Sequence, residues 1–400
     1  MSTKKNTVFN NALWLSVVHF SSYIIPLLEV PILARALGAE AYGSVVVAIS
    51  MALMMSIFVE FGFNISAARA VACKSPSEHG SIIGNVLAAK FVLFLLATCI
   101  VAPVAWFSAF ESTLIAPALL YFFAFAFSPF WYFQGVQQMI LPAMINFFMR
   151  VLSLLLIFLI VTEPADAVLA LYILALCGLT NTLVTMVMMW VKVTSVTFTL
   201  AGLRGKLAEG WHAFLYRSSG DMIGTLSPLV LGATAGPYAV GMYTPADKIV
   251  RAVASLQTPV LMAFFPYLSK VIHDSRRESF LLVGSVVGAS LVIALSLYFL
   301  IPYVIVLFVG EGFADAIVLA KYLLLIIPLR MFNQSIVMAV FMPSGKDRVA
   351  GYPMALAVLW VASAGYVLAS GFGALGMVWA LISCEFFLAV YFLILARRLT

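Results

Sequence analysis

The chain has 400 residues, of which 64% are hydrophobic and only 10% are charged. Soluble domains carry about 25% charged residues, so this composition excludes a water-soluble globule and points to lipid as the main solvent. The formal net charge is +6, and the basic residues are distributed along the chain as in membrane proteins with a fixed orientation. We therefore exclude nucleic acid as a partner.

Long apolar stretches follow one another along the whole chain. A membrane-spanning helix needs about 20 mostly apolar residues. A window of that length predicts about twelve spans, at residues 9–33, 44–70, 80–107, 113–133, 140–161, 167–191, 212–234, 239–268, 280–308, 315–341, 350–369 and 374–395. The first stretch is too long for a signal peptide, and no small-residue cleavage site follows it. We therefore expect an all-α integral membrane protein.

Basic residues in the predicted loops indicate the orientation of these helices. Thirteen of them fall in short loops on the side of the two termini, whereas the opposite loops hold only Arg35. Short cytoplasmic loops are enriched in Lys and Arg. The sequence therefore predicts a multi-pass protein of a bacterial inner membrane with both termini in the cytoplasm.

The longest predicted connection, residues 193–210, lies at the middle of the chain and divides it into six-helix lobes at 1–200 and 201–400. A weak repeat supports this division, because the segment GAEAYG at 38–43 has a counterpart, GPYAVG, at 236–241. Halves with six helices each have the same orientation in the membrane, as the parallel repeats of some transporters do.

Several charged residues interrupt the apolar spans. The basic ones are Arg69, Lys90, Arg150, Arg217, Lys248, Arg251, Lys321 and Arg330, and the acidic ones are Glu29, Glu60, Asp221, Asp247 and Glu385. A charge at the bilayer centre costs about 2.5–3.5 kcal/mol on insertion scales, so these side chains must face one another, backbone carbonyls or a wet cavity. Their sum is positive, and a cavity that they line would attract an anion.

Four of the basic residues are the candidates for binding an anionic headgroup: Lys90, Arg150, Lys248 and Arg330. Apart from Asp247 beside Lys248, they have no acid at helical spacing that would satisfy them. Pro328 predicts a kink close to Arg330, because proline removes a backbone hydrogen bond. The remaining basic residues fit structural roles, such as snorkelling to a helix end.

Four acids are the candidates for ion coupling: Glu60, Asp221, Asp247 and Glu385. A carboxylate in a membrane span is expensive and can serve as a proton or cation site. The alternative is structural pairing. Asp247 and Arg251 are four residues apart, as are Arg217 and Asp221, and such pairs can form along one helix face. Glu60 and Glu385 have no base at that spacing, but each can pair with another helix.

Enzymatic classes find no support in the sequence. It has neither the phosphate loop G-x-x-x-x-G-K-[ST] nor the nucleophile elbow G-x-S-x-G, and no aqueous segment is long enough for a catalytic domain. The four cysteines and four histidines are dispersed without metal-ligand spacing. We therefore expect no cofactor and no metal site, and a transporter without its own ATPase.

Segments in the first 150 residues resemble a known family. They are PLLEVPILARALG at 26–38, YG at 42–43, EFGFNISAAR at 60–69 and WYFQG at 131–135, with Arg150 in the next span. These segments look like the opening helices of the Wzx-type polysaccharide flippases, which belong to the MOP exporter superfamily with the lipid II flippases and the MATE drug exporters. The carboxyl-terminal half matches in length and hydropathy.

The resemblance implies two six-helix lobes around a central cavity that opens alternately to each side of the membrane. It implies a monomeric transport unit and a substrate made of an oligosaccharide repeat unit on undecaprenyl pyrophosphate, bound for O antigen, exopolysaccharide or capsule. A polymerase and a chain-length regulator are the implied partners, besides membrane lipid. Gln137 and Gln138 stand where relatives often carry an acid and a base, so those loop charges are missing here.

Two other functions fit the same architecture. A MATE-like exporter of small cations is expected to have an acidic cavity, whereas the intramembrane balance here is basic. A membrane-embedded glycan polymerase or ligase is expected to carry a large periplasmic loop, whereas the external loops predicted here are short.

Overall fold

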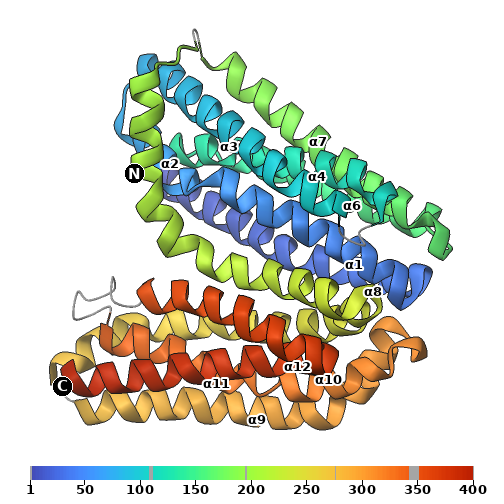
Figure 1. Cartoon of the computed structure of the whole chain (residues 1–400). Helices are drawn as coiled ribbons and strands as arrows, with labels where there is room; N and C mark the ends of the chain where they lie inside the picture. Colours follow the sequence, from blue (N-terminus) through green and yellow to red (C-terminus); the bar gives the residue numbers. More distant parts are fainter. Residues whose placement is uncertain (1, 108–110, 194–195, 275, 342–350, 400) are drawn as a thin grey trace. The chain divides into compact units, whose positions relative to one another are not determined.

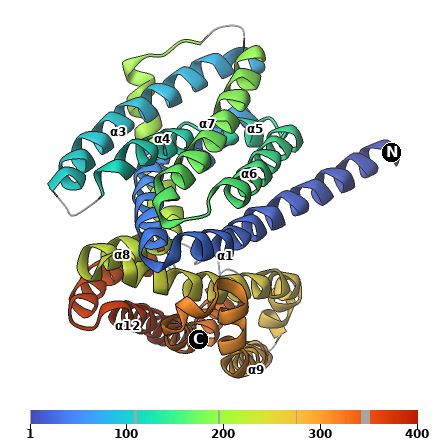
Figure 2. The same cartoon turned by 90° about the vertical axis from the view of Figure 1, so that its right-hand side faces the viewer.

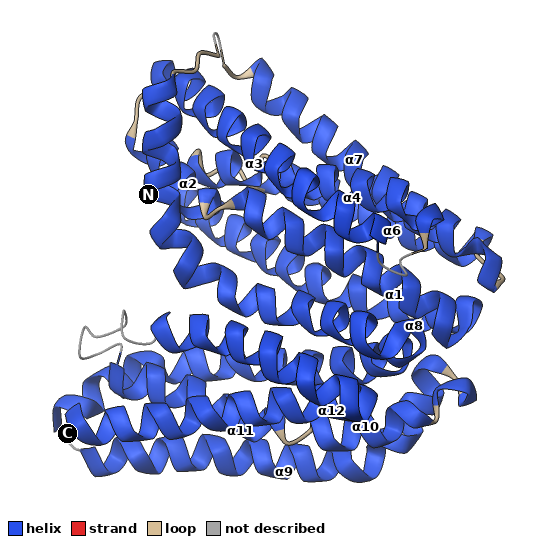
Figure 3. Ribbon diagram, viewed as in Figure 1, coloured by secondary structure: helices blue, strands red, loops and turns tan. Residues whose placement is uncertain are grey.

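The protein is described by a computed structural model that covers residues 2–107, 111–193, 196–274, 276–341 and 351–399 (Figure 1). Within these ranges the secondary structure is helical, without strands (Figure 3). The helices are α1 (Ser2–Glu60), α2 (Phe63–Cys73), α3 (His79–Phe107), α4 (Ile115–Ala126), α5 (Phe130–Gly135), α6 (Ile140–Ile160), α7 (Ala167–Val191), α8 (Leu200–Asp274), α9 (Arg276–Val309), α10 (Asp315–Leu323), α11 (Ile326–Ile336) and α12 (Gly351–Leu399).

These helices confirm the prediction of an all-α integral membrane protein. Eight segments of the described residues are long and apolar enough to cross a membrane. Three of the eight, Ile24–Cys73, Gly220–Gln257 and Pro353–Ala396, are unusually long, and each contains parts of two predicted spans. Many large apolar side chains face outward, for example Leu295 and Phe299 on α9. Exposure of this kind suits contact with lipid.

Glycines divide the long helices at the boundaries that the sequence predicted. α1, α8 and α12 each contain one residue with non-helical backbone angles, which is Gly38, Gly236 and Gly373 respectively. All three have a positive φ, which glycine adopts without steric cost. The predicted span 315–341 is also divided, because α10 ends at Leu323 and α11 begins at Ile326, shortly before Pro328.

The structure separates into two compact units. The first comprises Met1–Leu37 and Ser44–Thr225, and the second comprises Gly38–Gly43 and Leu226–Thr400. The boundary in the second half of the chain therefore lies at 225/226 in the structure, compared with 200/201 in the sequence prediction. The short segment Gly38–Gly43 belongs to the second unit although its neighbours on both sides belong to the first.

In the first unit, α7 packs along both α4 and α6, as Figures 1 and 2 show. The short helix α2 packs against α5. Phe63 of α2 and the aromatic residues Trp131, Tyr132 and Phe133 of α5 belong to one buried cluster. A side chain at Gly135 would lie 2.7 Å from Cβ of Val71. The two short helices are therefore held closely together.

In the second unit, α11 packs against both α9 and α12. The segment Gly38–Gly43 meets the corresponding segment 236–241 in a reciprocal contact. A Cβ atom at Gly43 would overlap the carbonyl oxygen of Pro237, and one at Gly241 would overlap that of Ala39. Each segment thus presents a glycine to the carbonyl of the other, which is the pattern of an isologous contact across a two-fold axis.

Candidate functional site

A break between α4 and α5 places polar backbone groups inside the first unit. Pro129 has no N–H to continue the helix, so α4 ends at Ala126 and leaves carbonyl groups without helical partners. The carbonyl of Ala124 accepts a hydrogen bond of 2.6 Å from the hydroxyl of Thr182 on α7. The carbonyl of Ala126 accepts one of 2.8 Å from the ammonium of Lys90 on α3. Side chains of two neighbouring helices therefore satisfy the end of α4.

A second break separates α1 from α2. Glu60 is the last residue of α1, and it is followed by Phe61 and Gly62, which both have a positive φ. The amide of Asn64 donates a hydrogen bond of 3.1 Å to the Glu60 carboxylate. Glu60 also interacts electrostatically with Lys90. Two of the charged residues singled out in the sequence therefore act on each other where two helices are interrupted.

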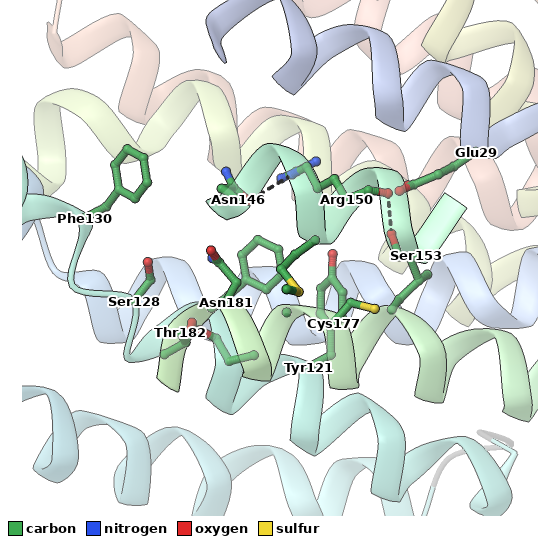
Figure 4. A pocket seen from close by; sticks show the side chains of 15 residues that line it. Glu29, Tyr121, Ser128, Phe130, Asn146, Arg150, Ser153, Cys177, Asn181 and Thr182 are labelled. Carbon is green, nitrogen blue, oxygen red and sulfur yellow. Dashed lines mark hydrogen bonds between the residues drawn. The ribbon is translucent and has the colours of Figure 1, made fainter. Parts of the chain in front are cut away.

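Beside the break in α4 lies a pocket of about 120 Å³ (Figure 4). Its polar lining side chains come from α1, α4, α6 and α7 and from the α4–α5 connection, and they are Glu29, Tyr121, Ser128, Asn146, Arg150, Ser153, Cys177, Asn181 and Thr182. Phe125 and Phe130 add aromatic surface. A cation, amides, hydroxyls and rings around one cavity can bind a polar molecule that has an apolar face.

Arg150 is the basic group of this pocket. Its Nε donates a hydrogen bond of 3.4 Å to the side-chain oxygen of Asn146, one turn earlier on α6. The Tyr121 hydroxyl interacts electrostatically with both Arg150 and Glu29. The side-chain oxygen of Asn181 is buried and accepts no hydrogen bond from the described residues. A ligand that donates a hydrogen bond would satisfy this oxygen.

The other two basic candidates lie in the second unit. Arg330 of α11 donates a hydrogen bond of 3.0 Å to Glu385 of α12, and Asn333 donates one of 2.9 Å to the other carboxylate oxygen. This is the interhelical pairing that the sequence left open for Glu385. Lys248 is exposed at the surface of its unit.

The acidic candidates Asp247 and Asp221 lie in different units. Asp247 forms the ion pair along α8 that its spacing from Arg251 indicated, with a distance of 2.6 Å. It lies close to the hydroxyl of the buried Tyr243. Asp221 belongs to the first unit and is exposed there. The four acids therefore differ in burial: Asp247 is buried, Glu60 and Glu385 are partly buried, and Asp221 is exposed.

The sequence analysis overlooked several residues of the pocket. Asn146, Asn181, Tyr121 and Thr182 are uncharged, and the search for intramembrane charges passed over them. A usable signal was nevertheless present, because Asn146 and Arg150 are four residues apart and lie on one face of a predicted span. Lys90 was singled out by its charge, and in the structure its ammonium donates to backbone carbonyls and the residue is 0% exposed.

The model of the family described as polysaccharide biosynthesis protein matches residues 8–272. The chain belongs to the polysaccharide biosynthesis protein family. This confirms the family resemblance that its first 150 residues indicated. The eight long apolar helical segments among the described residues are those of a multi-pass membrane protein.

Two curated relatives of this polysaccharide biosynthesis protein are described as candidate O-antigen transporters. The one from Escherichia coli K12 is 28% identical over 349 residues, which cover 82% of this chain and 81% of the relative. The one from Shigella dysenteriae is 24% identical over 395 residues, which cover 96% of this chain and 98% of the relative.

Solved structures of membrane transporters have a fold similar to that of this polysaccharide biosynthesis protein. The lipid II flippase MurJ in an inward closed conformation matches with a TM-score of 0.78 at 13% identity, over 96% of this chain and 87% of that one. The eukaryotic MATE transporter AtDTX14 matches with a TM-score of 0.56 at 14% identity, over 98% of each chain. At such low identity these matches establish the fold alone.

Proposed function

We propose that the protein is a flippase that moves oligosaccharide repeat units linked to undecaprenyl pyrophosphate from the cytoplasmic to the periplasmic leaflet. The observation that carries this proposal is the pocket around Arg150, in a chain whose family is that of polysaccharide biosynthesis. A guanidinium suits a phosphate or an acidic sugar, because its planar fork matches these anions. The amides and hydroxyls suit sugar hydroxyl groups, and Phe125 and Phe130 offer surfaces for ring stacking.

We propose that transport occurs by alternating access. In this proposal the N and C termini lie in the cytoplasm of a bacterial cell. We assign Lys248, which is exposed at the surface of its unit, as the second basic residue for an anionic headgroup. Arg330 is paired with Glu385 in the conformation described here and would bind substrate only after that contact opens. Lys90 donates to backbone carbonyls, and we assign it a positive charge near the pocket rather than a substrate contact. The polyprenyl tail would remain in lipid.

We propose that one of four acids couples transport to an ion gradient; these are Glu60, Asp221, Asp247 and Glu385. A monomer is sufficient for this cycle, and a polymerase and a chain-length regulator would act on the units after transfer.

The test uses a strain that lacks the gene and carries plasmid-borne variants. Arg150→Ala should reduce surface polymer at least tenfold at equal protein level, whereas Arg150→Lys should retain part of it because the charge remains. Lys321→Ala is the matched control, since Lys321 lies over the ring of Tyr298 in the second unit and does not line the Arg150 pocket. Full polymer in Arg150→Ala would remove the pocket from the proposal.

The sidedness of lipid-linked repeat units in cells without the protein separates flipping from polymerisation. Accumulation on the cytoplasmic side supports a flippase. Single units on the periplasmic side would instead favour a polymerase and contradict the proposal.

A further inference from the structure

The ammonium of Lys90 lies at the end of an interrupted membrane helix. The residue is 0% exposed, although lysine is almost never fully buried without a partner. Its Nζ donates to the carbonyl of Ala126 at 2.8 Å and to that of Ser128 at 3.4 Å. Both carbonyls belong to the last residues before Pro129, where the chain leaves the helix.

The last four carbonyls of α4 each have an identified partner. The carbonyls of Phe123 and Phe125 accept backbone N–H groups of the turn that follows, at 3.1 and 3.3 Å. The carbonyl of Ala124 is satisfied by Thr182. The carbonyl of Ala126 receives its hydrogen bond from Lys90, so removal of this side chain would leave it and the carbonyl of Ser128 directed at a buried space.

The electrostatic surroundings of this space favour a cation. The carboxyl end of a helix carries a partial negative charge, which here belongs to α4. Glu60, at the neighbouring helix break, is the charged group that acts on Lys90. Carbonyls of unwound backbone at the end of a half-helix are the groups with which membrane transporters coordinate Na⁺. Here the same kind of group holds the nitrogen of a side chain.

We propose that Lys90 is a tethered cation, whose ammonium permanently occupies a monovalent-cation site formed by the carbonyls of Ala126 and Ser128 with Glu60 nearby. The first unit therefore takes up no free Na⁺ or K⁺ at this helix break. Glu60 is neutralised within the protein, which removes it from the four candidates for ion coupling. The tethered charge also fixes the connection that carries Ser128 and Phe130 into the Arg150 pocket.

The experiment asks whether a free ion can replace the ammonium. Lys90→Ala removes the charge and opens space, whereas Lys90→Met removes the charge but fills most of the space. The purified full-length protein is unfolded thermally in NaCl, in KCl and in choline chloride of equal ionic strength. We expect Lys90→Ala to be destabilised in choline and stabilised saturably by Na⁺ or K⁺. At an ion concentration about 100 times its Kd, linkage raises the folding equilibrium constant about 100-fold.

The wild type and Lys90→Met should show no such specific response, and neither should Lys321→Ala. An unfolding temperature of Lys90→Ala that is the same in all three salts would overturn the proposal. Failure of this variant to fold in Na⁺ and in K⁺ would overturn it as well, because the proposal requires a free ion to restore the site. An equal ion response in the wild type would show that the site is not already occupied.

A second measurement rests on the proposed flippase function and separates the two ideas. In the deletion strain, Lys90→Ala should restore surface polymer in medium rich in the stabilising ion and lose it when choline replaces that ion. Ion-dependent stability confirms the tethered cation whatever the polymer result. Ion-dependent stability without any transport by the wild type would contradict the flippase function alone.

Discussion

The guanidinium of Arg330 on α11 and the carboxylate of Glu385 on α12 form an ion pair between two helices, with an N–O distance of 3.0 Å. Asn333 binds the second carboxylate oxygen, so both oxygens of Glu385 are satisfied within the second unit. The side chains are 27% and 13% exposed, and solvent therefore screens the pair only in part. The contact joins two residues that are 55 positions apart in sequence.

Replacing Glu385 by Gln should destabilise the second unit by about 2 kcal/mol, because hydrogen bonds to charged groups contribute about 1.5–3 kcal/mol. Thermal unfolding of the purified variant measures this. Glu209→Gln is the matched control, since Glu209 is more than half exposed in its pair with Lys206 and such pairs contribute at most about 1 kcal/mol. Equal unfolding temperatures for the two variants would show that the α11–α12 pair has no special role.

Gly43→Ala should lower both stability and surface polymer, since its Cβ would overlap the backbone carbonyl of Pro237. Gly241→Ala should do the same at Ala39. Backbone cannot move aside as a flexible side chain can, so each change forces the two segments apart. Gly288→Ala on α9 serves as control because nothing lies within 4 Å of its added carbon. That variant should be neutral or more stable by up to about 1 kcal/mol. Wild-type behaviour of Gly43→Ala would refute the close approach.

Thr182→Val removes the donor to the carbonyl of Ala124 and leaves this carbonyl buried without a partner. The expected cost is about 1–3 kcal/mol. Thr180→Val on the same helix is the comparison, because the Thr180 hydroxyl is exposed and donates to the carbonyl of Leu176 in its own helix. A larger loss of stability for Thr180→Val than for Thr182→Val would mean that the end of α4 is satisfied in some other way.

Cys177 lines the Arg150 pocket, so its thiol should report on occupancy of that cavity. In a variant with the other three cysteines replaced by serine, a small methanethiosulfonate reagent should modify Cys177 and reduce surface polymer severalfold. Cys177→Ser should make the same background insensitive to the reagent. Complete modification without any loss of polymer would separate this pocket from transport.

Sequence reasoning identified the spans well because membrane helices reveal themselves by length and apolar content. The breaks at Gly38 and Gly236 were also visible, since two similar glycine-rich segments stood in corresponding places. The contact between these segments was not predictable, because it joins residues that are about 200 positions apart. The α4–α5 break was missed for a local reason: Pro129 lies inside a run of aromatic residues whose hydropathy continues across it.

The site residues were harder to assign because a charge in an apolar span has several possible partners. The spacing of Asp247 and Arg251 correctly indicated a pair along one helix. By contrast, Arg330 and Glu385 lie on different helices, and Lys90 binds backbone, which has no sequence signature. Arg150 was identified by its charge, whereas the amides that complete its pocket are uncharged and therefore give no comparable signal in the sequence.

Gly38–Gly43 belongs to the second unit, so its contact with that unit can form only late in the synthesis of the chain. This segment leaves the ribosome about 200 residues before the segment 236–241 that it contacts. At about 5–20 residues per second, the delay is roughly 10–40 s. During that time the first two predicted spans are already synthesised, but the segment 236–241 that their connecting turn contacts is not. A second unit expressed alone, from Leu226 onward, would lack one half of its reciprocal contact.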